Sequence, residues 1–285
     1  MIKGFKKGFT LIELIFVIVV LGIVLGIVAE VISRMFSGYI EARTIDRLQS
    51  KTEVAVQQAA SRLSYRVNPS TSAINPDDGT RIQVVDADDD YEILEWIGRD
   101  HELFRGTATS TDPVWSGFID LEDSDASSVS TPGSNLTNWN GSGAIFFRGR
   151  MDDSDINRYY AQADTDASTH YGYPVSVDSD TRFNFDENYI ADPNTGVRIT
   201  LYEQYDLSTS AYALVPEDDI LWLYYNYRPW AGESYNDSGV DRAILVDGLE
   251  TFRFTQVGEV LRLKICAHES DGKDELIVCK EKAIL

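Results

Sequence analysis

Residues 9–29 read FTLIELIFVIVVLGIVLGIVA, a run of 21 amino acids in which Glu13 carries the only charge. About 20 consecutive apolar residues are enough for an α-helix to cross the hydrocarbon core of a membrane. Lys3, Lys6 and Lys7 precede the run, and acidic residues dominate the chain after it. Because basic residues favour the cytoplasmic side, the run predicts a single-pass helix with its N-terminus in the cytoplasm and the rest of the chain across the membrane.

The leader, residues 1–8, is short and basic and ends in Gly8. An ordinary secretory signal has a small-residue cleavage site after its apolar stretch, and this chain has none there, so the apolar segment is predicted to be retained. A carboxylate in a membrane helix costs about 2.5 to 3.5 kcal/mol on insertion scales and usually has a function. Glu13 is therefore a candidate functional residue, and partial hydration near the membrane interface is the alternative interpretation.

Residues 8–14, GFTLIEL, resemble the prepilin motif of type IV pilins and type II secretion pseudopilins, and the likeness extends over residues 3–28. It implies that a prepilin peptidase cuts between Gly8 and Phe9 and that Phe9 is then N-methylated. It also implies that Glu13 meets the N-terminal amine of a neighbouring subunit, where two opposite charges offset each other's desolvation. The partners implied are the peptidase, other pilin or pseudopilin subunits and the inner-membrane assembly platform.

Gly22 and Gly26 have the four-residue spacing that lets two membrane helices approach closely. They would also loosen the helix when it leaves lipid for a filament core. Many major pilins carry a proline at the position of Glu30, so this departure favours a pseudopilin or a minor subunit.

The helical pattern continues beyond the membrane run, because apolar residues recur at intervals of three or four. The residue before Pro69 is disfavoured in a helix, so we predict one helix from Phe9 to Val67, roughly 90 Å long at 1.5 Å per residue. Its first half would lie in the membrane or filament core, and its second half would pack on a sheet. The predicted buried face consists of Ile32, Met35, Tyr39, Ala42, Ile45, Gln49, Thr52, Val56, Ala59, Leu63 and Val67.

After Pro69 the chain changes to short strand-like runs separated by clusters of Asp, Asn, Ser, Gly and Pro. The predicted fold class is α+β and pilin-like, with the long N-terminal helix packed on a C-terminal antiparallel β-rich domain. We expect four segments: the leader 1–8, the transmembrane or filament-core helix 9–29, its amphipathic continuation 30–68 and a periplasmic β-rich domain 69–285.

Within the β-rich part, residues 123–140 and 151–180 are rich in polar residues and are predicted to form long surface loops or insertions. Alternating and β-branched runs elsewhere predict the strands. These are Arg81–Asp86, Tyr91–Ile97, Ala144–Arg148, Val197–Tyr205, Ile220–Tyr227, Ala243–Val246, Thr251–Val257 and Val260–Ala267.

Cys266 and Cys279 are the two cysteines of the chain. In a domain outside the cytosol they favour a disulfide, and two reduced thiols or half of a metal site are the alternatives. Residues 219–267 resemble the late strands of larger minor pseudopilins, especially the J-type, and of PilW-like minor pilins. By that resemblance the cysteines would face each other in a hairpin that turns at 269–274.

The formal net charge of -21 excludes most phosphate-rich partners, so nucleic acid is not expected as a ligand. His101 and His268 are each followed by Glu but lack the second histidine of a zinc helix, and His170 lies in a polar loop without an evident partner. P-loop, nucleophile-elbow and dinucleotide-binding motifs are also missing. We therefore expect no enzymatic activity and no cofactor.

Acidic clusters at residues 86–90, 152–155 and 164–166 have two interpretations. Calcium takes six to eight oxygen ligands, and some pseudopilins bind calcium, but none of the clusters fits the EF-hand loop. Solvated loop charge is the favoured interpretation.

Residues 221–230 read LWLYYNYRPW, an aromatic strip. Alternation predicts Trp222, Tyr224 and Asn226 on one face and Leu223, Tyr225 and Tyr227 on the other. Core packing accounts for such a strip, and a docking surface for a subunit, a secreted substrate or a glycan is the alternative.

Together these features predict a minor pilin or pseudopilin of the bacterial inner membrane, assembled at or near the tip of a type II secretion pseudopilus or a type IV pilus. Such a subunit supports filament initiation and protein secretion. The competing hypothesis is a filament-displayed or membrane-anchored binding module that recognises a surface ligand or glycan.

Overall fold

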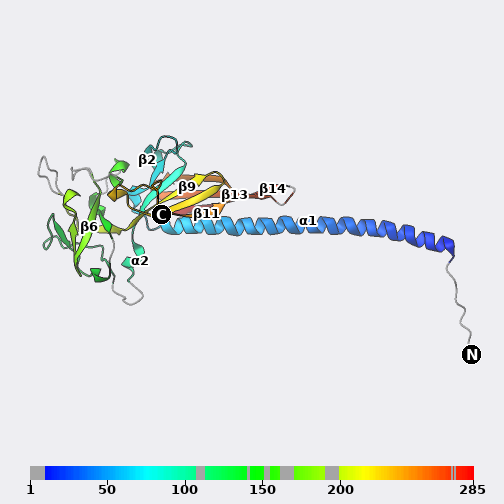
Figure 1. Cartoon of the computed structure of the whole chain (residues 1–285), viewed down its shortest axis with the longest axis horizontal. Coiled ribbons are helices and arrows are strands. Elements are labelled where there is room, and N and C mark those ends of the chain that lie inside the picture. The colour runs from blue at the N-terminus through cyan, green and yellow to red at the C-terminus, as the bar shows by residue number, and fades with distance from the viewer. Residues whose placement is uncertain are drawn as a thin grey trace, which may run out of the picture.

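The computed structural model describes residues 10–106, 113–139, 142–150, 155–160, 170–189, 199–270, 272 and 274–285. It confirms the predicted α+β class. One long helix, α1 (Leu11–Leu63), packs by its C-terminal half on antiparallel sheets, and its N-terminal half projects away from them (Figure 1).

A six-stranded antiparallel sheet forms the centre of the molecule. One of its faces packs on α1, and the other faces a second β-rich lobe. Its strands lie in the order β11 (Asp241–Asp247), β10 (Ile220–Tyr227), β9 (Ser210–Glu217), β3 (Ile93–Gly98), β1 (Ser72–Ile74) and β2 (Arg81–Gln83).

A three-stranded sheet covers another side of α1 through Leu261, Leu263 and Ile265, which are buried in the same core as the helix. We call α1 from Thr44 onward, together with these two sheets, the helix lobe. The order in the smaller sheet is β12 (Leu249–Val257), β13 (Val260–Ser270) and β14 (Glu275–Ile284).

The distal lobe is a five-stranded antiparallel sheet that lies beyond the C-terminal end of α1 (Figure 1). Its own core holds large aromatic side chains, including Trp115, Tyr173 and Phe183. The short helix α2 (His101–Phe104) follows β3 and leads into this lobe. The strands lie in the order β4 (Ser128–Ser130), β7 (Arg182–Phe185), β6 (Gly172–Ser179), β5 (Gly143–Phe147) and β8 (Tyr205–Ser208).

The helix α1 has 53 residues, which corresponds to about 80 Å, and it ends at Leu63 instead of the predicted Val67. The reason lies in the tertiary structure, because the next residues pair with β3. The Val67 amide donates to the Ile97 carbonyl at 2.8 Å, and the Arg99 amide donates to the Tyr65 carbonyl at 2.7 Å. This pairing ends the helix before the proline does.

The face of α1 that packs on the sheets agrees with the prediction from Thr52 onward. Before that point it is displaced by one residue, since Thr44 and Leu48 are buried in place of Ile45 and Gln49. Both sets obey helical spacing, and the position of the sheets selects between them. The buried residues of α1 are Thr44, Leu48, Thr52, Ala55, Val56, Ala59, Ala60 and Leu63.

An apolar layer joins the two lobes. Tyr224 and Tyr227 of β10 lie in it together with Phe146 of β5 and with Tyr159 in a 3-10 helix, η5 (Ile156–Tyr159). The predicted alternation along β10 holds up to residue 225, and an irregularity in its pairing with β9 then turns the Tyr227 side chain to the face of Tyr224. Both faces of the aromatic strip are therefore largely core, which argues against a docking surface there.

Several strand predictions were wrong. Residues 123–140 and 151–180 contain β4 and β6, so they are not simply surface loops. The predicted strand Val197–Tyr205 is not formed over its described part, because β8 begins only at Tyr205. Prediction also omitted β1, β7 and β9.

Candidate assembly surface

The N-terminal half of α1 exposes its apolar side chains. From Leu11 to Phe36 every side chain is exposed, and nearly all of them are apolar. The described residues contain one helix long and apolar enough to cross a membrane, and it is this one; none of its apolar window is buried. An exposed apolar surface of this size marks an interaction site, so lipid or other helices must cover it.

Glu13 lies in the first turn of α1, close to the helix start. Its carboxylate is 3.5 Å from both the amide and the hydroxyl of Thr10, in the arrangement of a capping box. The partial positive charge of a helix N-terminus favours a carboxylate at this position. A separation of 3.5 Å is long for a hydrogen bond, so the carboxylate is held weakly within its own chain. Gly8 and Phe9 lie outside the described residues.

Gly22 and Gly26 lie on the exposed half of α1. A Cβ atom added to either glycine would meet no other described atom within 4 Å, so packing within the chain does not require them. Four residues apart, they share one helix face. That face is open to a second helix.

Ion pairs hold the C-terminal half of α1 against the sheets. Lys51 Nζ lies 2.5 Å from the Asp247 carboxylate at the end of β11, and Arg47 pairs with Glu269 of β13. The hydrogen bond from Lys51 lowers the pKa of Asp247, against a smaller opposing effect of burial. The Arg47–Glu269 pair joins the β13–β14 hairpin to α1, and the hairpin lies alongside the helix (Figure 1).

A disulfide links Cys266 and Cys279. The two residues are directly opposite each other in the β13–β14 pairing, and the turn between these strands falls where the predicted hairpin turns. β14 is the C-terminal strand and packs on α1 through Leu276 and Val278. The disulfide therefore fastens the last strand of the chain to the sheet that supports the helix.

The three histidines make different contacts. His170, which was predicted to lie in a polar loop, is buried, and its carbonyl accepts a hydrogen bond from the Tyr173 hydroxyl at 3.0 Å. His268 lies 3.3 Å from Glu250. His101 stacks on Tyr65 with ring centroids 3.7 Å apart.

The acidic clusters show no metal-binding arrangement in the described part of the chain, where no group of three or more candidate ligands comes together. At residues 86–90, the Asp88 carboxylate accepts from the Asp90 amide at 3.2 Å, and Asp89 lies 3.7 Å from Arg253. Residues 152–154 and 164–166 fall outside the described residues.

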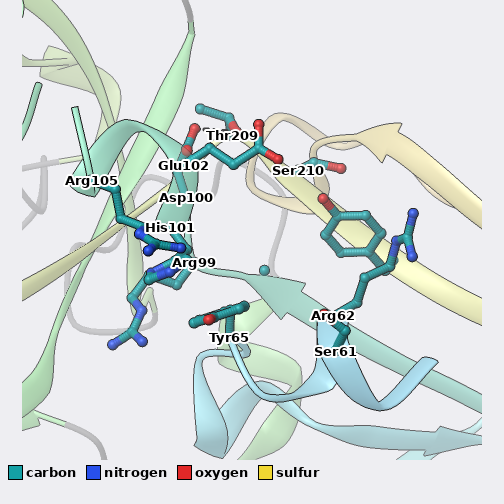
Figure 2. A pocket seen from close by; sticks show the side chains of 12 residues that line it. Ser61, Arg62, Tyr65, Arg99, Asp100, His101, Glu102, Arg105, Thr209 and Ser210 are labelled. Atoms are coloured by element: carbon teal, nitrogen blue, oxygen red, sulfur yellow. Dashed lines mark hydrogen bonds between the residues drawn. The ribbon is translucent and has the colours of Figure 1, made fainter. Parts of the chain in front are cut away.

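A cavity of about 590 Å³ opens where the end of α1, α2 and the start of β9 meet. Figure 2 shows Arg99, His101 and Arg105 on one wall and Arg62 on the opposite wall. Loss of hydration, followed by the charges of Arg105 and Arg99, lowers the pKa of His101. Among the side chains that the structure describes, none is hydrogen-bonded to the His101 ring, so the cavity shows no base paired with a nucleophile.

Sequence reasoning identified Glu13 but missed its capping partner Thr10 and the arginines of the cavity. Thr10 and Glu13 form the pattern of a capping box, a signal that is readable in the sequence. The arginines of the cavity come from separate elements, Arg62 from α1 and Arg99 and Arg105 from either side of α2. No local pattern could have predicted their meeting.

Comparison with known proteins gives one family match, to the prokaryotic N-terminal methylation motif, over residues 4–29. No curated protein and no solved structure matches the chain. The matched segment includes the leader, Glu13 and most of the exposed apolar helix. This motif, together with a long apolar helix that no described residue of the chain covers, supports a membrane-anchored, single-pass protein of the type IV pilin-like class that prepilin peptidase processes.

Proposed function

We propose that the protein is a minor pilin or pseudopilin subunit that assembles at or near the tip of a type II secretion pseudopilus or type IV pilus. The observation that carries the proposal is the apolar half of α1, which belongs in large part to a methylation motif and which no described residue of the chain covers. The peptidase cuts between Gly8 and Phe9, and Phe9 becomes N-methylated. The helix then moves from lipid into the filament core, where sibling subunits cover it.

The subunit begins in the inner membrane with its N-terminus in the cytoplasm and its two lobes in the periplasm. Lys3, Lys6 and Lys7 support this orientation. The Cys266–Cys279 disulfide supports it independently, because disulfides persist in oxidising compartments. The role requires no cofactor and no enzymatic turnover.

Glu13 positions the incoming subunit. Its carboxylate is weakly held by Thr10, so it is free to pair with the N-terminal amine of a neighbour. In hydrocarbon this pair is favourable because each charge offsets the desolvation of the other. An incorrectly registered subunit would leave both charges unpaired.

The shape of the molecule supports placement at the tip. The distal lobe lies beyond the end of α1, on the side away from the membrane segment (Figure 1). If every subunit along the filament carried a second lobe in this position, neighbouring lobes would crowd one another. A subunit present only at the end of the filament avoids this crowding. Glu30, where many major pilins have proline, also favours a minor subunit.

The competing binding-module hypothesis is weakened by the burial of the aromatic strip that motivated it. Tyr224 and Tyr227 are 8% and 0% exposed, and both belong to the layer between the lobes. An adhesin would need a different surface.

The test combines processing with assembly. Coexpression with the cognate prepilin peptidase is expected to remove residues 1–8 and to add one methyl group to Phe9, as measured by intact mass. Glu13→Ala is expected to leave membrane insertion intact and to reduce incorporation into filaments at least about tenfold, since an unpaired buried charge costs several kcal/mol. Incorporation is measured by immunoblot of sheared filaments.

Glu30→Ala is the matched control, because it removes another exposed glutamate from the same half of α1, one that pairs only with Arg34 among the described residues. It is expected to keep incorporation near the wild-type level. Normal incorporation of Glu13→Ala, or an uncut chain in the presence of the peptidase, would reject the proposal.

A further inference from the structure

The cavity of Figure 2 adjoins a second one, and the two share part of their lining. The first cavity measures about 590 Å³ and the second about 340 Å³, and they share Arg99 and His101. We call the combined surface the α2 groove, because α2 forms the ridge between its two parts. It lies at the junction of the two lobes and is built from residues of both.

The charge of the α2 groove is opposite to that of the protein. The chain as a whole has 46 acidic and 25 basic residues. The groove is lined by four arginines, with Asp100 and Glu102 as its carboxylates. A basic surface in so acidic a chain attracts anionic partners that other faces repel.

Two carboxylates near the groove already form ion pairs or accept hydrogen bonds, and the carboxylates that line it are fewer than its four arginines. Asp206 is buried beneath it and pairs with Arg148 at 2.6 Å and with Arg99 at 3.6 Å. Asp100 accepts hydrogen bonds from the Leu103 amide at 3.1 Å and from the Thr209 hydroxyl at 3.0 Å.

Two of the groove's exposed arginines, Arg62 and Arg105, have no partner of opposite charge among the described residues. No carboxylate in the described part of the chain lies within 4.0 Å of Arg62 or Arg105. Arg62 reaches only the Gln58 carbonyl, at 3.4 Å. Two guanidinium groups are thus available to bind a carboxylate.

The groove also offers aromatic surface. Tyr65 and His101, which stack on each other, line it, and Phe104 and Phe118 are 44% and 46% exposed. Large aromatic side chains exposed beside arginines are typical of peptide-binding surfaces.

The positions of the arginines favour a long ligand over a small one. Arg62 lies on the wall opposite Arg99 and Arg105, so the three guanidinium groups do not converge on one point (Figure 2). A single small anion would bind one wall only, whereas an extended chain with several carboxylates would reach both. Lipid headgroups are excluded by position, because Arg62 is about 50 Å along α1 from Ala29 at the end of the membrane run.

We propose that the α2 groove binds an extended acidic peptide segment of another protein, with its carboxylates on Arg62 and Arg105 and an apolar side chain against Phe118. A long nucleic acid is disfavoured, because it would pass over the acidic surface around the groove. This inference does not depend on the position of the subunit within a filament.

The test uses the full-length protein in detergent micelles and a fluorescein-labelled Glu-rich peptide with two Phe residues. Anisotropy is expected to show saturable binding that high salt weakens. The double variant Arg62→Glu and Arg105→Glu is expected to bind at least about tenfold more weakly, since two attractive contacts become repulsive. Both arginines are exposed, so the fold should persist, and circular dichroism checks this.

Arg253→Glu is the matched control, because it makes the same change at an exposed arginine on β12, outside the groove. It is expected to retain wild-type binding, and a peptide with Lys in place of Glu is expected not to bind. Absent binding, equal binding by the double variant, or full displacement by inorganic phosphate at matched ionic strength would overturn the proposal. The last result would instead identify a site for small anions.

Discussion

The two halves of α1 belong to one continuous helix but have opposite relations to the rest of the chain. Residues 11–43 are almost entirely exposed, and the first part of this segment is strongly apolar. Residues 44–63 carry many polar groups, yet they bury one face against two sheets. The more hydrophobic half is thus the half without an intramolecular partner.

This difference shows that hydrophobicity alone does not place a helix in the core of its own domain. In the C-terminal half, the buried side chains recur every three or four residues, which leaves a polar face for solvent. In the N-terminal half, apolar residues surround the helix, as in a segment that lipid or other helices enclose. The same backbone therefore serves as a core element at one end and as an assembly surface at the other.

The largest expected effect on stability separates the two halves directly. Leu63 is fully buried and Leu21 is 54% exposed. Leu63→Ala is expected to lower the free energy of unfolding by about 2 to 5 kcal/mol through loss of apolar burial and creation of a cavity. Leu21→Ala is expected to change it by less than about 0.5 kcal/mol.

Denaturant unfolding in detergent, followed by tryptophan fluorescence, measures both variants, because all five tryptophans lie after α1. Equal losses in the two variants would show that the exposed half also contributes to the core. Leu21→Ala is expected to act on membrane insertion or filament yield instead.

A smaller effect is expected from the disulfide, which holds β14 against the buried half. Replacement of Cys266 and Cys279 by Ser is expected to lower the free energy of unfolding by about 2 to 4 kcal/mol, as is usual for a short closed loop. Reduction of the wild-type protein should give a similar loss, and the double variant should not respond to reductant. A response of the variant to reductant would contradict this account.

The smallest effect concerns one ion pair in each half. The hydrogen bond from Lys51 lowers the pKa of the Asp247 carboxyl below its ordinary value. A carboxyl group whose folded-state pKa is lowered stabilises the fold above its unfolded pKa and loses that contribution as the pH falls through the folded value. Because the Asp247 side chain is 68% exposed, the pair contributes less than about 1 kcal/mol.

Lys51→Met is therefore expected to cause a small loss of stability at neutral pH that disappears as the pH falls through the lowered folded-state pKa of Asp247. Arg34→Met removes the Arg34–Glu30 pair from the exposed half and is the matched control. Its effect on unfolding of the lobes is expected to be nil. Melting temperatures over a pH series measure both, and a loss for Lys51→Met that grows on acidification would contradict the assignment.

Much of the helix and part of the sheet were predictable from local patterns. The apolar run and its leader predict the exposed half of α1, and the strand Ile220–Tyr227 was predicted with the bounds that β10 has. The disulfide between Cys266 and Cys279 was favoured by their closeness in the sequence and by the expected compartment. In each case neighbouring residues in the sequence carry the signal.

The errors occur where distant segments decide the structure. β9 (Ser210–Glu217) contains two alanines, which have low strand propensity, and it is a strand because β3 and β10 flank it. β6 lies in a stretch whose polar composition predicted a loop, yet Tyr173 and Val175 are buried in the distal lobe. Strand pairing between remote segments supplied what the local pattern lacked.

The amino-acid sequence established the membrane helix, its orientation signal and the processing motif, since each depends on composition and spacing over a few turns. The tertiary structure decided that Thr44 and Leu48 face the core, that the aromatic strip is buried, and that Arg62, Arg99 and Arg105 share one groove. The physical reason is that these three outcomes depend on contacts between segments that are distant in the sequence, in some cases by more than a hundred residues. Such contacts form only when the sheets close around α1.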